Sequence, residues 1–189
     1  MRLKDDQKTH QIFAGALALT ARVGLAGLTV PLIAREAGVA TGTIYIYFKN
    51  KEELIRELFK DTKQRFSRGV FIGYKVDGPV KESLRKIWEN MLRYSVEHYP
   101  AQVFMQQYRI SPYSRETESL ALSAMQPLLD VIAEGQKQDL VKGGNPGFIL
   151  VLLAGFGGQL AGMLQEQPGL LTKEYIETTF GFVWDAMKK

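Results

Sequence analysis

The chain has 189 residues, 46% of them hydrophobic and 23% charged, and no cysteine, which excludes a disordered chain, a disulfide framework and a thiolate metal site. Its net charge of +4 is uneven, because residues 1–75 hold 13 Lys and Arg against 7 Asp and Glu, whereas residues 76–189 hold 11 against 13. The N-terminal part is therefore the part suited to a polyanion such as nucleic acid.

The first predicted helix spans Asp5–Val23. Apolar residues recur in it at helical spacing, at Ile12, Ala16 and Leu19, and Gly24 follows as a helix-terminating residue. No apolar segment precedes this helix, so we expect no secretory signal. The lack of cysteine fits a reducing cytoplasm, which is the location that we expect.

Two short helices joined by a tight turn are predicted between Thr29 and Lys51. Thr29 is a suitable N-cap, and Pro31 falls in a first helical turn that does not use its N–H. Gly38 supplies the positive φ angle that the reversal of the chain needs. The next segment, Thr41–Tyr47, is too short and too rich in β-branched and aromatic residues to be stable alone. A recognition helix held by its neighbours is typical of this pattern.

The residues T-V-x-x-I-A-x-x-A-G-V-x-x-G-T-I-Y-x-Y-F-x-x-K-x-x-L closely resemble the signature of the TetR family of bacterial transcriptional repressors. The resemblance runs from about Gly24 to Leu58 and fixes residue types at many positions. The rest of the chain resembles the family only in length and helix pattern. The resemblance implies a helix-turn-helix DNA-binding domain at residues 1–50 and a helical ligand-binding and dimerisation domain at residues 51–189.

Two positions depart from the family pattern. Ala40 stands where relatives often have Ser or Thr, so the cap of the recognition helix must shift to Thr41 or be lost. Ile46 stands where many relatives have a polar residue or an imidazole. If Ile46 points outward, it can make only apolar contacts, for instance with a thymine methyl group.

Hydroxyl and cationic side chains in this region suit contacts with phosphate, and Lys51 is the residue that we expect on a DNA phosphate. Together with the resemblance, they predict the following DNA-binding residues: Thr29, Thr41, Gly42, Thr43, Tyr45, Ile46, Tyr47 and Lys51.

Helical periodicity continues to the end of the sequence, and no stretch alternates with period two for long enough to make a sheet. A helix at 51–73 is predicted to join the two halves of the chain. Prolines then delimit helices at 79–98, 100–110, 115–139 with a kink at Pro127, 145–166 and 172–187. The predicted fold class is all-α, with about nine helices.

The segment Gly147–Leu164 is almost wholly apolar, so it is either buried on most sides or spans a membrane, and it lacks the flanking basic cluster of a spanning helix. Small residues at spacing i, i+4, i+8 and the amphipathic segment after it suggest a homodimer interface. The alternative is that both segments form the core of one chain. The predicted dimer-interface residues are Ala154, Gly158, Gly162, Phe180 and Trp184.

Catalysis has little support in the sequence. His10 and His98 are far apart and lack metal-ligand spacing, and no nucleophile elbow, paired carboxylates or phosphate-binding glycine loop is present. We therefore predict neither an enzyme nor a cofactor nor a metal site.

The middle helices are rich in aromatic residues and methionine, which line sites for bulky, partly apolar ligands but equally form cores. The resemblance implies a small-molecule inducer bound in this half. Glu89 and Glu97 would favour a cationic ligand if either faces inward. The predicted ligand-binding residues are Phe59, Phe66, Trp88, Met91, Tyr94, Phe104, Tyr108 and Phe156.

These observations predict a homodimeric repressor that binds a palindromic operator in double-stranded DNA and is released by a small, partly apolar molecule. The alternative is a helical binding or scaffold protein that keeps the helix-turn-helix fold and does not recognise a DNA sequence.

Overall fold

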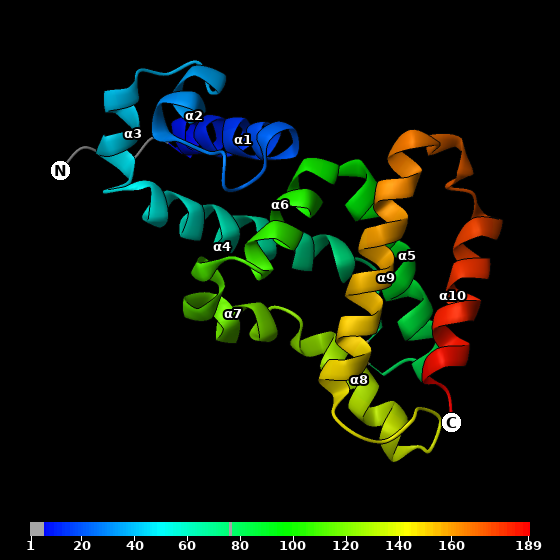
Figure 1. Cartoon of the computed structure of the whole chain (residues 1–189). Coiled ribbons are helices and arrows are strands. Elements are labelled where there is room, and N and C mark those ends of the chain that lie inside the picture. The colour runs from blue at the N-terminus through cyan, green and yellow to red at the C-terminus, as the bar shows by residue number, and fades with distance from the viewer. Residues whose placement is uncertain (1–5, 76) are drawn as a thin grey trace. The chain divides into compact units, whose positions relative to one another are not determined.

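The computed structural model describes residues 6–75 and 77–189, so Asp5 lies outside the described residues. In these ranges the chain is all-helical, as predicted, and apart from one isolated bridge between Val141 and Lys188 it contains no β-structure (Figure 1). The α-helices described are α1 (Asp6–Val23), α2 (Val30–Glu36), α3 (Thr41–Tyr47), α4 (Lys51–Val70), α5 (Val80–Glu97), α6 (Tyr99–Arg109), α7 (Glu118–Ser123), α8 (Gln126–Lys137), α9 (Pro146–Glu166) and α10 (Lys173–Met187), with short 3-10 helices η1 (Pro112–Thr117) and η2 (Pro168–Leu170).

The prediction of one helix at 115–139 is wrong, because this segment is broken into several shorter helices. In its place the structure has the end of η1, then α7, a turn at Ala124 and Met125, and α8. Pro127 lies in the first turn of α8, where its missing N–H is not needed, so it begins a helix and does not kink one. This break explains why the described residues form ten α-helices where about nine were predicted. The helix predicted at 51–73 ends earlier, at Val70.

The chain forms two compact units. The first contains the residues up to Lys63 together with Pro100–Ser119, and the second contains Gln64–Tyr99 and Leu120–Lys189. The predicted boundary after residue 50 concerns the helix-turn-helix alone and stays a prediction. The helix α4 has residues in both units, as expected of a joining helix, but α6 and α7 do as well. A segment from the second half of the chain, Pro100–Ser119, is therefore part of the first unit.

In the first unit, α1 and α2 pack at a point where only glycine fits. A Cβ atom on Gly15 would lie 2.9 Å from the backbone nitrogen of Ala37, so any larger residue would push the two helices apart. Arg22 donates a hydrogen bond to Glu36 on the same pair of helices, and this bond holds the pKa of the Glu36 carboxyl below its ordinary value. The contact between α1 and α2 is thus fixed by both shape and charge.

The segment Pro100–Ser119 is held in the first unit by two contacts. The side-chain oxygen of Gln107 accepts a hydrogen bond of 2.6 Å from the backbone N–H of Leu25, just after α1. The buried Tyr108 stacks on Phe59 with ring centroids 4.0 Å apart, and its hydroxyl donates to the Tyr113 carbonyl at 2.9 Å. A glutamine and a tyrosine therefore tie the middle of the chain to the loop after α1 and to α4.

The second unit is built around α5, which packs against α8, α9 and α10 (Figure 1). Trp88 lies at its centre with no exposed surface, and its indole N–H donates to the Thr179 hydroxyl at 3.2 Å. The ring of Trp88 stacks on Phe156 at 5.7 Å, and a Cβ on Gly157 would lie 3.1 Å from the end of Met91. Glycine on α9 thus allows close packing against α5.

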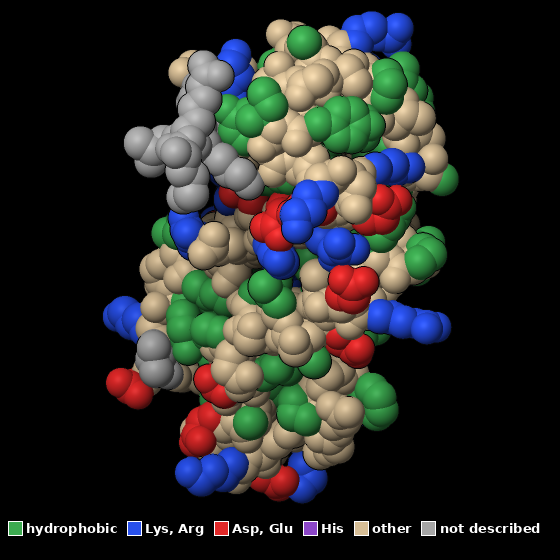
Figure 2. All heavy atoms as spheres, turned by 90° about the vertical axis from the view of Figure 1, so that its left-hand side faces the viewer, with side chains coloured by type: hydrophobic (Ala, Val, Ile, Leu, Met, Phe, Trp, Pro, Cys, Tyr) green, Lys and Arg blue, Asp and Glu red, His purple; other side chains and the backbone are tan. Residues whose placement is uncertain are grey.

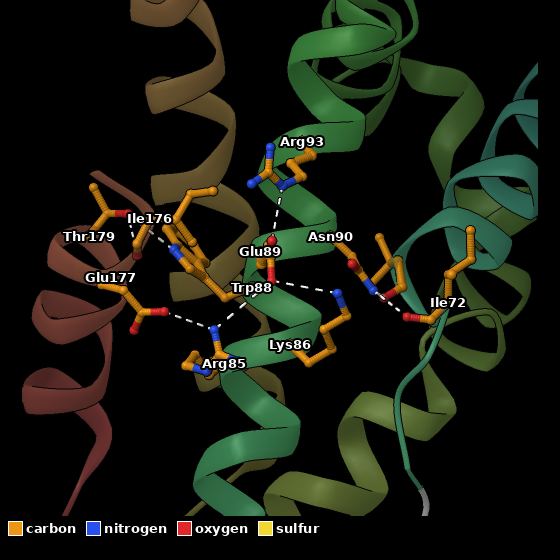
Figure 3. Close-up of polar contacts among 11 residues, drawn as sticks. Ile72, Arg85, Lys86, Trp88, Glu89, Asn90, Arg93, Ile176, Glu177 and Thr179 are labelled. Carbon is orange, nitrogen blue, oxygen red and sulfur yellow. Dashed lines mark hydrogen bonds and ion pairs between the residues drawn. The ribbon is translucent and has the colours of Figure 1, made fainter. Parts of the chain in front are cut away.

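A polar network covers the outer side of α5 (Figure 3). Glu89 accepts a hydrogen bond from Arg93 at 3.0 Å and lies 3.5 Å from Lys86 and 4.0 Å from Arg85. Burial acts to raise the pKa of Glu89, but the hydrogen bond from Arg93 and the nearby cations outweigh it and lower that pKa. Glu97 is exposed. Neither carboxylate therefore offers an inward-facing, uncompensated charge for a cationic ligand.

The C-terminal end of α4 is capped by a side chain of α5. The Asn90 amide donates to the carbonyls of Val70 at 2.9 Å and Ile72 at 2.7 Å, which are among the acceptors that a helix leaves without partners at its end (Figure 3). A Cβ on Gly69 would lie 2.3 Å from the Tyr94 ring, so this end of α4 also packs closely on α5. The last turn of α4 is therefore firmly part of the second unit.

The middle of α4 carries two polar groups that burial disfavours. Thr62 is buried, and its hydroxyl has no hydrogen-bond partner among the described residues. Lys63 is half-buried, and burial lowers the pKa of its amine from 10.5 to about 8. Both groups lie where α4 passes from the first unit to the second.

Replacing Lys63 with Met should stabilise the protein at pH 7. Below pH 8 the amine is charged in both the folded and the unfolded state, so burying the charge lowers the free energy of unfolding by its full amount. As the pH rises from about 8 to 10.5, the folded state loses the proton first and the cost disappears. Lys63→Met should raise the free energy of unfolding by on the order of 1–3 kcal/mol at pH 7.

Urea unfolding at several pH values measures this difference, which should shrink above pH 8. Lys60→Met is the matched control, because Lys60 is exposed on the same helix and forms a surface ion pair with Glu57 one turn away. A difference that is independent of pH would contradict the assignment to the Lys63 amine.

Candidate nucleic-acid interface

The helix-turn-helix forms as the sequence predicts. The Thr29 hydroxyl accepts from the backbone N–H of Leu32 and so caps α2, and Pro31 lies in the first turn. Gly38 has φ +65°, a left-handed conformation that side chains with a Cβ rarely adopt, and a Cβ there would meet no other atom. Glycine is therefore required at the turn by the backbone angle and not by crowding.

The recognition helix α3 begins without a side-chain cap. Its N-cap residue is Ala40, which makes no capping hydrogen bond, so of the two expected outcomes the cap is lost. Within α3 only Ile44 is buried, at 1% exposure, and Phe48 follows it with its ring 5.7 Å from Phe13 of α1. Two apolar anchors, one turn apart, hold a helix of seven residues that could not persist alone.

The predicted DNA-binding residues all reach the surface of the first unit. Tyr45 and Ile46 are the most prominent large side chains, with 54% and 64% of their surface exposed. Ile46 thus points outward, which was the condition for an apolar contact with a base. The others are exposed or half-buried: Thr29, Thr41, Gly42, Thr43, Tyr47 and Lys51.

The start of α4, at Lys51, is capped by two neighbouring side chains that the sequence analysis did not identify. The Asn50 side chain accepts from the backbone N–H of Glu53 at 2.8 Å, and the Glu53 carboxylate accepts from the backbone N–H of Lys49 at 2.5 Å. The spacing of a cap residue and a glutamate three positions later is a recognisable capping-box signal. With this cap, α4 begins at Lys51.

Figure 2 shows the face that carries the N-terminal helices in its upper part. Apolar side chains reach the surface there among uncharged atoms, with Lys and Arg side chains near them, while Lys, Arg, Asp and Glu are interspersed further down. An uncharged surface bordered by cations is compatible with the edge of a base pair flanked by phosphates.

The structure divides the predicted ligand-binding residues between the two units. Phe59, Phe104 and Tyr108 lie in the first unit, and Tyr108 contacts both phenylalanines. The second unit contains the other five: Phe66, Trp88, Met91, Tyr94 and Phe156. In that unit Phe66 meets Tyr94 edge to face at 5.5 Å, and Trp88 stacks on Phe156. The first unit thus holds one connected aromatic cluster, whereas the second holds two separate aromatic pairs.

The predicted dimer residues are partly covered within one chain. Phe180 is only 3% exposed and Gly158 is buried, so neither has much surface left to bury in a partner, whereas Ala154 is exposed and Gly162 and Trp184 are half-buried. Sequence spacing had not separated the inner and outer faces of α9 and α10. The apolar side chains that these helices expose most are Phe148, Val151, Leu152, Met163 and Phe182.

By length and composition, α9 is the one helix among the described residues that could cross a membrane. Part of it is buried inside the second unit, as in the core helix of a folded domain. In the ranges 6–75 and 77–189, no group of three or more His, Cys, Asp or Glu side chains is arranged to hold a metal ion.

Comparison with known proteins identifies the helix-turn-helix. Residues 12–58 match the family model described as bacterial regulatory proteins, tetR family. A curated HTH-type transcriptional regulator of Haemophilus influenzae is 33% identical over 112 residues, which is 59% of this chain and 60% of that protein. Residues 12–58 thus belong to the DNA-binding part of the tetR family of bacterial regulatory proteins.

Solved structures extend the likeness beyond the N-terminal helices. A TetR-family transcriptional regulator from Haemophilus influenzae aligns over 100% of both chains with 26% identity and a TM-score of 0.82. The regulator FadR from Bacillus subtilis, solved in complex with stearoyl-CoA, covers 93% of this chain and 95% of its own, with 23% identity and a TM-score of 0.71. At that identity the second likeness concerns the fold alone.

The family match covers α1 from Ile12 onward, α2, α3 and the first part of α4, and this range includes the predicted DNA-binding residues. The curated relative is matched over less than two thirds of its length. Family membership therefore supports the interface on α3 most directly.

Proposed function

We propose that the protein is a cytoplasmic, homodimeric transcriptional repressor that binds a palindromic DNA operator through α3 and is released by a small, partly apolar molecule. The observation that carries the proposal is the exposed surface of α3, which is held by Ile44 and Phe48 and bordered by the capped Lys51. A scaffold protein has no need to expose Tyr45 and Ile46 on such a helix. No enzyme activity or cofactor is part of the proposal.

Phosphate and base contacts are assigned by chemistry. Lys51 and the hydroxyls of Thr29 and Thr41 suit the DNA backbone, because they donate to phosphate without distinguishing bases. Tyr45 and Ile46 stand furthest out on α3 and suit the major groove, which is wide enough to admit a helix.

Dimerisation is proposed through the outer face of α9 and α10. Its apolar side chains share one side of α9, with Val151 at 58% and Met163 at 64% exposure, and α9 has no charged residue before Glu166. Several exposed apolar side chains on one helix are typical of an association site. Two copies would place two recognition helices at half-sites roughly 34–36 Å apart, one turn of B-form DNA.

Ligand release is proposed through the aromatic clusters and α4. The residues that we propose for the ligand remain Phe59, Phe66, Trp88, Met91, Tyr94, Phe104, Tyr108 and Phe156. Phe59 and Phe66 lie on α4 on either side of Thr62 and Lys63, the polar pair that burial disfavours. We propose a ligand with an apolar body and an anionic group. The stearoyl-CoA bound by the FadR neighbour has this character.

Because α4 has residues in both units, a ligand that favours one orientation of this helix would change the spacing of the recognition helices. DNA and ligand would then favour different conformations of one dimer. By linkage, a ligand that weakens DNA binding tenfold binds about tenfold more weakly to the DNA complex, a coupling of about 1.4 kcal/mol.

Lys51→Ala tests the DNA contact. Loss of one phosphate contact in each half-site should weaken binding to all sequences alike and reduce the salt slope by about one unit per half-site. Fluorescence titrations at several salt concentrations, with the DNA upstream of the protein's own gene and with random DNA, measure both effects. Lys60→Ala is the control on the same helix. An unchanged slope removes Lys51 from the phosphate, and equal, weak binding of the parent protein to both DNAs favours the scaffold alternative.

Val151→Glu tests the dimer face. A carboxylate buried against apolar side chains without a partner costs several kcal/mol, so the variant should sediment as a monomer and lose operator affinity. Ala133→Glu, an exposed position on α8, should stay a dimer. A Val151→Glu dimer of normal affinity would place the interface elsewhere.

Stearoyl-CoA tests the ligand class. Added to the operator complex at micromolar concentration, it should release the protein from DNA, whereas coenzyme A without the acyl chain should not. Anisotropy of labelled operator DNA measures the release. If neither compound releases the protein and neither binds it in calorimetry, a ligand of the stearoyl-CoA type is excluded.

A further inference from the structure

The recognition helix lacks the side chains that most often distinguish bases. Between Thr41 and Tyr47 it contains no Arg or Lys to pair with guanine and no Asn or Gln to pair with adenine. Its outward side chains are hydroxyls, which bind several bases, and one aliphatic group, Ile46. Sequence preference on this helix must therefore come in part from an apolar contact.

Ile46 is not needed to hold α3 in place. That task falls to Ile44, which is buried, whereas Ile46 keeps 64% of its surface exposed. Tyr45, the neighbouring residue, is 54% exposed but carries a hydroxyl group, so Ile46 is the exposed aliphatic side chain of α3. β-Branching also lowers helix propensity, so neither packing nor helix stability accounts for isoleucine at this position.

The major groove presents one apolar group on the four base pairs, the C5-methyl group of thymine. The other exposed atoms there are hydrogen-bond donors and acceptors, which an aliphatic side chain would leave without partners. If Ile46 faced cytosine or a purine, the polar atoms of that base edge would lose bound water and gain no hydrogen bond in return. The geometry of α3 therefore matches one base much better than the other three.

We propose that Ile46 contacts the C5-methyl group of thymine in each half-site and so favours an A·T pair at that position. The proposal rests on the DNA-binding function proposed above. Burial of one methyl group corresponds to about fourfold in affinity, so two half-sites together correspond to roughly fifteenfold.

Deoxyuridine is the direct probe, because it pairs as thymine does and lacks only the methyl group. Operators are first selected from a random DNA pool with the parent protein. Each thymine is then replaced in turn by deoxyuridine, and affinities are measured at one salt concentration. One position in each half-site should lose about fourfold.

Ile46→Ala identifies the side chain that makes the contact. The variant should bind the thymine and deoxyuridine duplexes equally at that position. Thr43→Ala on the same helix is the matched control and should keep the fourfold difference. Because Ile46 is exposed, its replacement should leave the circular dichroism and melting temperature unchanged.

A second duplex separates the methyl group from the rest of the base. Cytosine in place of thymine should weaken binding of the parent protein, and 5-methylcytosine should recover part of the loss. If no thymine is sensitive to deoxyuridine, or if Ile46→Ala keeps the sensitivity, the proposal is wrong. If selection yields no preferred sequence at all, the proposed DNA-binding function itself fails.

Discussion

The burial of Ile44 is the interaction on which the interface depends. A seven-residue helix with no side-chain cap cannot form by itself, and its conformation is fixed by this one side chain and by Phe48 beside it. Because helical residues one and two positions from Ile44 point elsewhere, anchoring it turns Tyr45 and Ile46 outward. One apolar contact thus decides both the stability of α3 and the side chains that it presents.

The same unit shows how the second half of the chain can influence α3. Gln107 binds the backbone at Leu25, and Tyr108 stacks on Phe59 of α4, so a segment from the middle of the chain packs with the DNA-binding helices. The helix α4 continues into the second unit, where Asn90 and Tyr94 hold its last turn. Between these two ends lie Thr62 and Lys63, which burial disfavours. Burial is therefore least favourable for the polar side chains in the middle of α4.

The second unit shows how an apolar helix can serve two surfaces. One side of α9 packs on α5 around Trp88, and the other exposes Val151 and Met163. Burial on one side is consistent with the apolar composition that makes α9 resemble a membrane-spanning segment, and the exposed side is the face proposed above for dimerisation. Isolated surface apolar residues would not require an explanation, but several on one helix face do.

The sequence by itself determined the all-α class, the helix-turn-helix and the bounds of α3, because capping residues, glycine at the turn and helical periodicity act over a few neighbouring positions. It also identified Ile46 as unusual.

The sequence could not show that Pro127 begins a helix, since proline is compatible with both a kink and a first turn. Periodicity likewise assigned residues to helices without showing which face of α9 is inner, so Phe180 and Gly158 were placed at the interface although one chain already covers them. The division of the aromatic residues between the two units and the return of Pro100–Ser119 to the first unit were decided only by the tertiary structure, because contacts such as Gln107 to Leu25 join residues far apart in the chain. No local pattern encodes such a contact, since it depends on where the packed helices bring their side chains together.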